Sequence, residues 1–424
     1  MNLILGGGIA GISAAYHLNK KGLEYKLCER NNSWGGLCDN FTINGFLFDY
    51  FVHLSFTTDN YIKDLFALST PFIKHKPISY NYYKGKWIKH PVQNNLAILS
   101  SKEKVRIIQD FVNKPAIAPK NYEEWLLVQF GKYFTANFPS VYTKKYWTVN
   151  AKELGTDWVG ERFSLPELSD ILKGAFEEQS DNHYYAKEMR YPQKGGYKAF
   201  LSSMADAIKI SLNKEAILID PTNKQVEFSD GTKEYYKNLI SSIPLPELVK
   251  LIKDCPKEVT ETSNDLMATS GQLVSLGFNR PDIPKYLWAY IYDEDIYPAR
   301  VYSPSLKSSK NVPEGKSLLQ FETYFSKYYP KKLSGDALID HVVAKGEQMK
   351  MFSKKDIDAV DYREVKYTNV VFDHKRQKAV DAIHSYLQEI GITYIGRFGE
   401  WDYLWSDQSL LSGMKVVEKI SNGN

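Results

Sequence analysis

A glycine triplet near the N-terminus has the spacing of a phosphate-binding turn. Gly6, Gly8 and Gly11 follow the apolar run 2–5 and precede the helix-forming run 12–18. In this pattern the first glycine permits a tight turn, the second lets the backbone approach a pyrophosphate, and the third lets helix and strand pack closely. The helix N-terminus adds free amide groups and a partial positive charge. The triplet therefore predicts a site for the pyrophosphate of a dinucleotide.

An acidic residue completes this fingerprint. Glu29 follows a second apolar run, 25–28, at the spacing expected for a carboxylate that bonds a ribose hydroxyl. A glycine motif alone is weak evidence for a nucleotide site. Strand, glycine turn, helix, strand and acid in this order predict a β-α-β dinucleotide-binding unit.

Two further turns favour FAD over NAD. Arg30 follows the acid directly, and Gly35-Gly36-Leu37 adds a second glycine turn against which a cofactor can lie. Near the C-terminus, residues 396–399 (Gly-Arg-Phe-Gly) precede a helix that we expect to begin near Asp407, whose N-terminus is another place for phosphate, ribityl or flavin oxygen. The expected cofactor-binding residues are Gly6, Gly8, Gly11, Glu29, Arg30, Gly36, Leu37, Arg397 and Asp407.

Composition narrows the class of protein. A chain of 424 residues predicts two or three domains, and 43% hydrophobic with 25% charged residues is typical of a globular protein. A net charge of +4 does not indicate a nucleic-acid surface. The three cysteines have neither metal-ligand spacing nor a disulfide pattern, so we expect no metal. No apolar run is long enough to span a bilayer, and the chain begins directly with a strand, so we expect a cytoplasmic protein without a signal peptide.

The order of elements predicts an α/β protein: a Rossmann-like FAD-binding domain with an inserted helical domain and an antiparallel β-sheet substrate domain. Apolar runs that end in turns recur at both ends of the chain, with helical and alternating segments between them. The expected segments are 1–78, 191–270 and 351–424 for FAD binding, 79–190 for the mainly helical domain with one hairpin at 79–88, and 271–350 for the antiparallel substrate sheet.

Short motifs between these glycine turns carry a more specific signal. In chain order they are Gly45-Phe46-Leu47-Phe48-Asp49 with His53, Trp87 to Asn95, Tyr142-Thr143-Lys144-Lys145-Tyr146-Trp147, Trp158 to Arg162, Tyr191 to Tyr197, Trp288-Ala289-Tyr290 with Arg300, and Gly396 to Trp401 with Asp407. From residue 4 to residue 416, the chain thereby resembles the UDP-galactopyranose mutase family. That family is part of the FAD superfamily that includes amine oxidases and protoporphyrinogen oxidase.

The resemblance implies an isomerase without net redox change. Such an enzyme interconverts the pyranose and furanose forms of a nucleoside-diphosphate sugar, here UDP-galactose or a related UDP or dTDP sugar, for cell-surface polysaccharide biosynthesis. The active cofactor is reduced FAD, with flavin N5 as the nucleophile at the anomeric carbon. NADH or NADPH is a candidate reductant, although the sequence holds no second dinucleotide fingerprint.

The resemblance also assigns residues to the reaction. Arg162 and Arg300 are expected to hold the diphosphate, because guanidinium groups match phosphate oxygens and stay charged. His53 is expected in a loop that moves with the flavin redox state, and a purely structural role is the alternative for His53 and Trp288. The expected substrate-binding residues are Trp147 at the sugar, Tyr142 in the same motif, Gln93, Trp288 and Tyr290 at the base, and Tyr324 and Tyr367 at the diphosphate.

Three departures from the family pattern leave the substrate open. Phe51-Val52 replaces a Gly-Gly pair before His53, which predicts a stiffer loop. His90 and Val92 replace two aromatic residues of the base-binding segment, which leaves the nucleotide base undecided.

Two other function classes compete with the mutase. One is an FAD oxidase or desaturase of the amine-oxidase or protoporphyrinogen-oxidase type, against which the two arginines and the Tyr142–Trp147 motif argue. The other is a flavoprotein that binds a nucleotide sugar or a partner without catalysis. The sequence does not indicate an oligomeric state.

Overall fold

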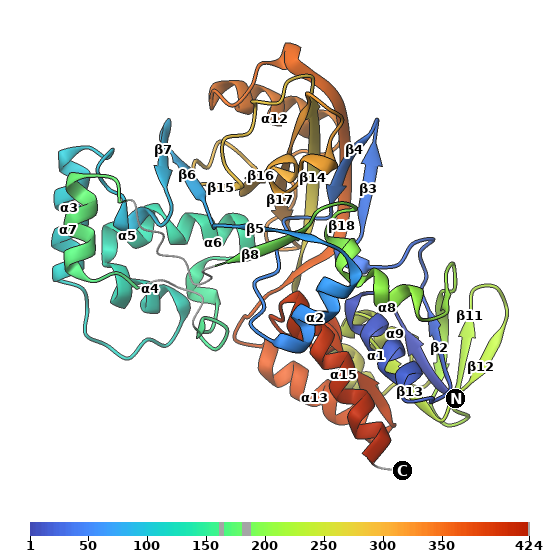
Figure 1. The fold of residues 1–424 in the computed structure, drawn as a ribbon. Coiled ribbons are helices and arrows are strands. Elements are labelled where there is room, and N and C mark those ends of the chain that lie inside the picture. The colour runs from blue at the N-terminus through green and yellow to red at the C-terminus, as the bar shows by residue number, and fades with distance from the viewer. Residues whose placement is uncertain (161–164, 180–187, 423–424) are drawn as a thin grey trace.

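The computed structural model describes residues 1–160, 165–179 and 188–422 (Figure 1). Its lower part is built on a parallel five-stranded sheet whose order is β19-β13-β1-β2-β9. The strands are β1 (Asn2–Leu5), β2 (Tyr25–Cys28), β9 (Ile210–Ser211), β13 (Asn238–Ser241) and β19 (Ile392–Tyr394). Segments from the beginning, middle and end of the chain thus meet in one sheet.

Two helices pack side by side against this sheet. Helix α1 (Ile9–Lys20) joins β1 to β2, and α15 (Ser406–Asn422) lies along it. A Cβ atom on Gly413 would lie 2.3 Å from the carbonyl oxygen of Ala10, so only glycine allows this close approach. The C-terminal helix is thereby fixed beside the first glycine turn.

The upper part is a seven-stranded, mostly antiparallel sheet of order β18-β14-β17-β16-β15-β6-β7, in which only β15 and β6 pair in parallel (Figure 1). Its strands are β6 (Ser79–Tyr83), β7 (Lys86–Lys89), β14 (Ala268–Phe278), β15 (Trp288–Ile291), β16 (Arg300–Tyr302), β17 (Ser317–Phe325) and β18 (Ile357–Val370). Helix α12 (Asp336–Gln348) packs on its far face.

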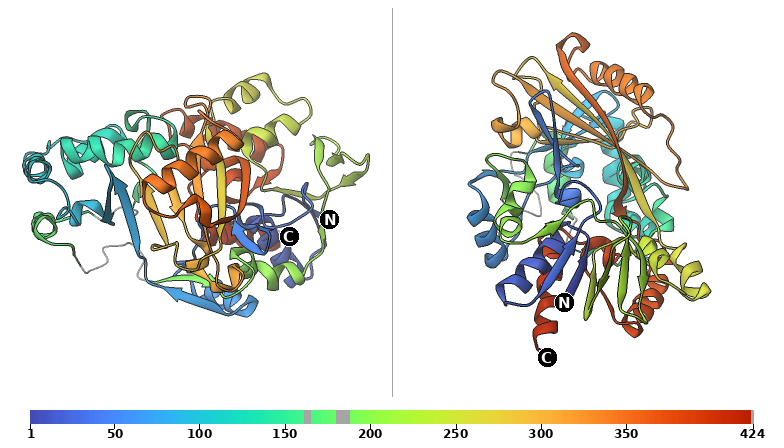
Figure 2. Two further views of the ribbon diagram at one scale, coloured as in Figure 1. Left: turned by 90° about the horizontal axis from the view of Figure 1, so that it is seen from above. Right: turned by 90° about the vertical axis from the view of Figure 1, so that its right-hand side faces the viewer.

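A helical region projects to one side of this sheet, away from the N-terminus (Figure 2). Its helices are α3 (Ser101–Val112), α4 (Tyr122–Phe130), α5 (Lys132–Asn137), α6 (Pro139–Trp147) and α7 (Leu168–Phe176). Local sequence sets their starts: Ser100 and Glu103 form a capping box at α3, Asn121 caps α4, and Pro139 opens α6.

Smaller elements complete the fold. The further strands are β3 (Asn40–Ile43), β4 (Phe46–Asp49), β5 (Phe72–His75), β8 (Met189–Pro192), β10 (Ala216–Asp220), β11 (Gln225–Phe228) and β12 (Lys233–Tyr235). The further helices are α2 (Asn60–Ser69), α8 (Ser202–Asp206), α9 (Leu245–Leu251), α10 (Lys257–Ser263), α11 (Pro304–Lys307), α13 (Arg376–Glu389) and α14 (Gly396–Gly399). In the part of the chain that the structure describes, no helix combines the length and apolarity needed to cross a bilayer.

The predicted fold class, a Rossmann-like unit with inserted helices and an antiparallel sheet, is confirmed. The segments expected from the sequence do not each form a sheet of their own, however, because strands from three of them join one sheet. The hairpin β6–β7 from 79–190 and strand β18 from 351–424 both join the seven-stranded sheet, so only the inner strands of that sheet come from 271–350. The domain boundaries themselves stay predictions.

A buried ion pair joins the hairpin β3–β4 to helix α11, which follows strand β16 of the seven-stranded sheet. Lys307 at the end of α11 lies 2.8 Å from Asp49 at the end of β4, and both side chains are fully buried. Asp49 also accepts hydrogen bonds from the Tyr191 hydroxyl at 2.7 Å and the Tyr197 amide at 2.9 Å. Burial lowers the pKa of Lys307, and the charge of Asp49 opposes this effect. Lys307 also donates to the carbonyl of His53 at 3.4 Å. The ion pair therefore helps to hold the loop after β4 that carries His53, which we call the histidine loop.

Replacement of Lys307 by Met should destabilise the protein by about 3–5 kcal/mol, because it leaves the Asp49 carboxylate buried without its cation. Urea unfolding followed by fluorescence measures the loss. Lys316→Met, which breaks a partly exposed ion pair with Asp358, is the matched control and should cost about 0–1 kcal/mol. Adding Asp49→Asn to Lys307→Met should restore part of the lost free energy of unfolding. A double variant that is less stable than Lys307→Met alone would contradict this role of the ion pair.

Candidate active site

The first glycine turn, at Gly6, Gly8 and Gly11, forms an open cradle of backbone at the start of α1. Gly8 precedes α1 and no side chain caps the helix, so its first amide groups point out of the turn without a side-chain partner. A Cβ atom on Gly11 would lie 1.9 Å from the carbonyl oxygen of Gly6. Gly6 itself has a φ of +102°, which favours glycine. The turn therefore presents bare backbone at a helix N-terminus, as a pyrophosphate site requires.

The second glycine turn packs directly on the first. The amide of Gly35 donates to the carbonyl of Gly7 at 2.8 Å, and a Cβ on Gly36 would lie 3.2 Å from the Cα of Gly8. Glu29 is buried behind them, where its Oε2 accepts from the Gly7 amide at 2.6 Å. In this structure Glu29 braces the turn, and its bond to a ribose stays a prediction.

The third turn, at residues 396–399 near the C-terminus, lies close to the two glycine turns. Arg397 in α14 donates through Nε to the carbonyl of Leu404 at 2.7 Å, and its guanidinium lies 5.3 Å from the ring of Tyr403. Helix α15 begins at Ser406, with Asp407 in its first turn, close to where the sequence predicted the helix to start. Arg397, Tyr403 and Ser406 line a cavity next to the cradle.

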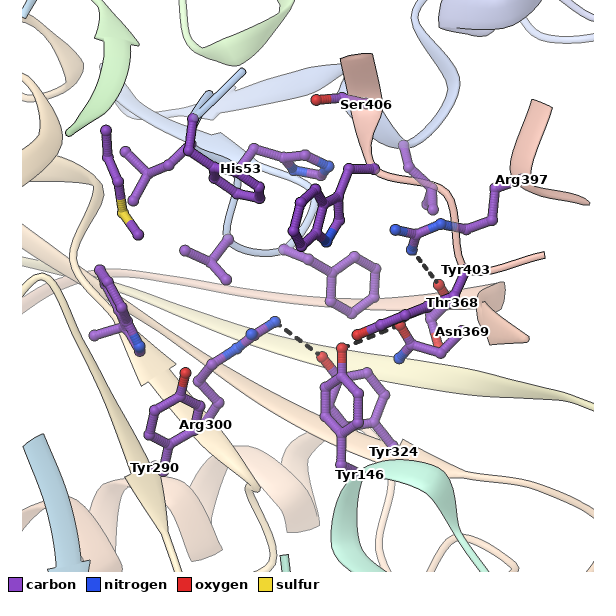
Figure 3. A pocket seen from close by; sticks show the side chains of 18 residues that line it. His53, Tyr146, Tyr290, Arg300, Tyr324, Thr368, Asn369, Arg397, Tyr403 and Ser406 are labelled. Atoms are coloured by element: carbon purple, nitrogen blue, oxygen red, sulfur yellow. Dashed lines mark hydrogen bonds between the residues drawn. The ribbon is translucent and has the colours of Figure 1, made fainter. Parts of the chain in front are cut away.

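This cavity, of about 210 Å³, lies between the histidine loop and the seven-stranded sheet. Figure 3 shows His53 and Ser406 on one side of it and Arg300, Tyr324 and Tyr146 on the other. The predicted site residues that line it are Leu37, His53, Trp288, Tyr290, Arg300, Tyr324 and Arg397. Residues separated by more than 300 positions in the chain thus share one chamber.

Arg300 is held in the cavity by a buried carboxylate. Glu322, its cross-strand neighbour on β17, is fully buried and lies 2.7 Å from Nε and Nη2 of Arg300. Nη2 also donates to the Tyr324 hydroxyl at 3.4 Å. Burial is the largest single effect and would lower the pKa of Arg300, but the charge of Glu322 together with the nearby Tyr324, Tyr142 and Tyr146 outweighs it, so the pKa stands well above its ordinary value. Nη1 has no hydrogen-bond partner among the described residues and remains available to an anion.

Tyrosines surround this guanidinium. The ring of Tyr146 lies 5.7 Å from the Arg300 guanidinium carbon and 4.8 Å from the ring of Tyr324. Tyr142 stacks on Tyr146 at 5.4 Å and meets Tyr290 edge-on at 5.2 Å, so it supports the cavity wall from behind. Burial raises the pKa of Tyr146 and of Tyr324, which keeps both hydroxyls protonated as donors at neutral pH.

His53 faces the cavity as a neutral ring. Its Nδ1 is buried and has no hydrogen-bond partner among the described residues, and its ring lies 5.0 Å from that of Tyr197. Burial lowers the pKa of His53 to about 4, against which the charge of Asp49 acts only in part. A buried polar atom without a partner is rare in a folded protein and points to a group that this cavity receives.

Other predicted residues lie away from the cavity lining. Trp147 is buried 5.1 Å from Trp158, and it reaches the cavity through two lining residues, Tyr403 at 5.2 Å and Tyr146 at 5.1 Å. Tyr367 donates to Glu247 at 2.6 Å, outside the cavity. Gln93 lies in the 3₁₀ turn at residues 92–94 and does not line the cavity either. Arg162 lies outside the described residues.

The two base-segment departures occupy supporting positions. The buried ring of His90 lies 5.1 Å from Tyr290, and its Nδ1 is 3.3 Å from the side-chain oxygen of Asn81. Val92 is part of the hydrophobic core. Neither residue lines the cavity, so the loss of two aromatic rings changes what stands behind Tyr290.

Four residues have roles at the site that were not predicted from the sequence, namely Glu322, Asn369, Lys145 and Tyr146. Glu322 holds Arg300, and Asn369 accepts from the Tyr146 hydroxyl at 3.1 Å. Lys145 donates to the carbonyls of three residues at 2.7–3.1 Å, namely Ile291, Asp293 and Ile296. Burial lowers the pKa of Lys145 to about 7. It fixes the loop between the strands that carry Tyr290 and Arg300, which explains the lysine of the Tyr142–Trp147 motif. The four-residue spacing of Tyr142 and Tyr146, one helical turn, was the available signal for Tyr146.

Replacement of Gly11 by Ala should abolish retention of a dinucleotide cofactor, because the new methyl group would collide with the Gly6 carbonyl. Cofactor content after gel filtration, read from visible absorbance, measures it. Gly155→Ala, at a position with ordinary contacts and an ordinary φ, is the control and should keep wild-type content.

The stability of the cofactor-free protein should fall as pH is lowered from 6.5 towards 4. In this window the unfolded chain binds a proton at residue 53 that the folded chain, with its depressed pKa, does not bind. His53→Leu should flatten the dependence of the urea midpoint on pH. His90, whose pKa burial also lowers to about 4, should add a second, separate part of the slope. An unchanged slope in the double variant would show that neither ring is buried neutral.

Comparison with known proteins supports the architecture. Residues 4–68 match the family model described as an NAD(P)-binding Rossmann-like domain. The structure of a reduced UDP-galactopyranose mutase superposes with a TM-score of 0.93 at 25% identity, covering 100% of this chain and 96% of that one.

Two further solved structures share the fold at lower identity. One is an Exiguobacterium sp. 255-15 protein provisionally described as a protoporphyrinogen oxidase, with a TM-score of 0.77, 14% identity and coverage of 100% and 99%. The other is a redesigned putrescine oxidase, with a TM-score of 0.66, 15% identity and coverage of 99% and 98%. The resemblance to the UDP-galactopyranose mutase family, predicted from the sequence motifs, is thus confirmed by a structural match over the whole chain.

Proposed function

We propose that this protein is a flavin-dependent mutase that interconverts the pyranose and furanose forms of a nucleoside-diphosphate sugar, with UDP-galactose or a related UDP or dTDP sugar as substrate. The observation that carries the proposal is Arg300, a charged guanidinium with Nη1 open to a cavity beside the dinucleotide cradle. A pocket for an apolar amine has no use for such a cation, whereas a diphosphate leaving group requires one.

The residues of the cradle fit FAD. The pyrophosphate would bind to the bare amides of α1 and to the turn of Gly6, Gly8 and Gly11. The ribose at one end of the cofactor would be bound by Glu29 and Arg30. The flavin ring would be bordered by the first turn of α15, which contains Asp407, and by Gly36, Leu37 and Arg397. The buried, unpartnered Nδ1 of His53 is a further polar atom for it. When bound and reduced, the flavin supplies the nucleophile for the anomeric carbon. NADH or NADPH is the proposed reductant.

Arg300 and two tyrosines would stabilise the departing diphosphate. Nη1 of Arg300 offers a charged donor that is already oriented, and such a donor lowers the barrier to breaking the bond between the anomeric carbon and oxygen because it needs no reorganisation as negative charge develops. The hydroxyls of Tyr324 and Tyr146 donate to Glu322 and Asn369, so they would reach the diphosphate by turning their protons away from these acceptors. Glu322 keeps the guanidinium in place without neutralising Nη1. Arg162 is proposed as the second arginine.

The remaining residues would recognise the sugar and the nucleoside. Trp288 and Tyr290 line the cavity and can pack against a planar or apolar face. Trp147 and Tyr142 are proposed to support the sugar pocket through Tyr403 and Tyr146. Gln93 and Tyr367 remain proposed contacts to the base and diphosphate. The product, an activated furanose, suits a cytoplasmic step in cell-surface polysaccharide synthesis.

Dithionite-reduced protein should interconvert pyranose and furanose forms within a panel of UDP- and dTDP-hexoses, and the air-oxidised protein should not. Chromatography of the sugar nucleotides measures the conversion. A fully reduced flavoprotein without turnover on the whole panel would contradict the mutase. Peroxide release with an amine substrate would favour the oxidase instead.

Arg300→Ala should lower turnover by about 10²–10³-fold while FAD stays bound, because the leaving diphosphate loses its oriented cation. Arg280→Ala, which removes a half-exposed guanidinium paired with Asp282 on the protein surface, should leave the rate unchanged. Equal rates for Arg300→Ala and the wild type would remove Arg300 from the site.

A further inference from the structure

We propose that Arg376 is a positioning residue that holds the bend of the loop 401–405 and thereby sets where Tyr403 stands in the wall of the cavity. Arg376 begins α13 and is not among the residues that line the cavity. Tyr403 does line it, and its ring contacts Arg397 and the buried ring of Trp147. The inference goes beyond the proposed function, because the position of this wall matters to any ligand that fills the cavity.

The loop begins with a strained residue. Trp401 has a φ of +53°, the left-handed region that a bulky side chain rarely adopts. It follows the cap of the short helix α14, where the amide of Asp402 donates back to the carbonyl of Arg397 at 2.9 Å. Glycine ordinarily takes this position after a helix, because it has no Cβ atom to clash. The bend at Trp401 therefore needs support from outside the loop.

Arg376 supplies this support at the carbonyl of Trp401. Its Nε donates to the carbonyl oxygen at 2.9 Å, and its Nη2 donates to the same oxygen. The Trp401 ring is fully buried and its Nε1 has no hydrogen-bond partner among the described residues, so Arg376 acts on this residue through its backbone. The guanidinium also lies 4.3 Å from the ring of Phe372, which fixes its plane. A lysine, with a single nitrogen and no plane, could not reproduce this arrangement.

A second contact extends the hold of Arg376 to Tyr403. Nη2 of Arg376 lies 3.5 Å from Oδ1 of Asp402, and the same oxygen accepts from the amide of Tyr403 at 2.7 Å. Because Asp402 is half-exposed, this ion pair alone stabilises the loop little. Together with the buried bonds to the Trp401 carbonyl, it connects one guanidinium to three successive residues of the loop.

The end of the loop is held independently of Arg376. The amide of Trp405 donates to the side chain of Gln408 at 2.8 Å, which ties the end of the loop to the first turn of α15. Loss of Arg376 should therefore leave the start of α15 in place and let the bend at Trp401 relax. Tyr403 is the cavity-lining residue that lies between this bend and the fixed end.

Fluorine NMR of the full chain, with 3-fluorotyrosine in place of Tyr403 and excess FAD present, tests the inference. The wild type should give one resonance, and Arg376→Met should shift or split it, because the Trp401 carbonyl loses its donors. A second protein labelled at Tyr386, in the same helix as Arg376, reports general damage to α13. Its resonance should stay unchanged in Arg376→Met.

Three further variants keep the test decisive. Lys375→Met breaks an exposed ion pair with Asp265 next to Arg376, and should leave the Tyr403 signal unchanged. Arg376→Lys keeps a buried cation without the paired bonds to the carbonyl, and should move the signal even if Arg376→Met fails to fold. Asp402→Ala removes only the half-exposed carboxylate between Arg376 and the Tyr403 amide, and should also move the signal.

Binding of UDP and of dTDP to the FAD-loaded chain, measured by calorimetry, is a second readout, and this one rests on the proposed function. Arg376→Met should weaken binding of the tighter-binding nucleotide about fivefold or more. In a chain that carries Tyr403→Ala, the same change should weaken binding by less than about twofold, because Arg376 acts through Tyr403.

An unchanged Tyr403 signal in folded Arg376→Met, Arg376→Lys or Asp402→Ala would overturn the inference. A shift of the Tyr386 signal, or effects on nucleotide binding that simply add in the double variant, would overturn it as well. If neither nucleotide binds the wild type, the proposed function fails, and the fluorine signals still decide the role of Arg376.

Discussion

The buried ion pair between Asp49 and Lys307 holds the end of β4 against α11, at the point where Tyr191 and Tyr197 also bind the same carboxylate. A buried pair adds little net stability, since desolvation offsets most of its attraction, but a wrong register leaves two bare charges in the core. The pair therefore selects one docking of β4 and α11. Lys307 also binds the carbonyl of His53, so the pair helps to position the loop that contains Phe51, whose φ is +64°, and the neutral His53.

Burial gives the cavity its chemical character. It raises the pKa of the tyrosines and lowers that of His53, so these groups stay neutral and act only through hydrogen bonds at neutral pH. Arg300 stays charged because Glu322 compensates it. A site with neutral donors around one oriented cation suits a ligand that carries its own negative charge, and the dinucleotide cradle next to it sets the second ligand.

Those features of the fold and the site that have a local cause could be predicted from the sequence. The roles of Gly6 and Gly11 follow from backbone conformation and helix–strand approach within one turn, and the structure shows both. Non-local partners could not be predicted. The sequence marks residues 79–88 as a hairpin but does not reveal that β6 pairs in parallel with β15, because strand order depends on the whole topology. For the same reason the role of Glu322 could not be predicted, because its partners Arg300 and Val52 lie on other elements.

The central claim is that Arg300 and the glycine cradle bring a sugar diphosphate and a flavin into one chamber. A crystal structure of the reduced protein soaked with UDP and dTDP sugars tests it most directly. The account predicts FAD with its pyrophosphate on the α1 N-terminus and the sugar diphosphate on Nη1 of Arg300, with the sugar between them. A diphosphate bound elsewhere, with an intact and reduced flavin in the cradle, would contradict it.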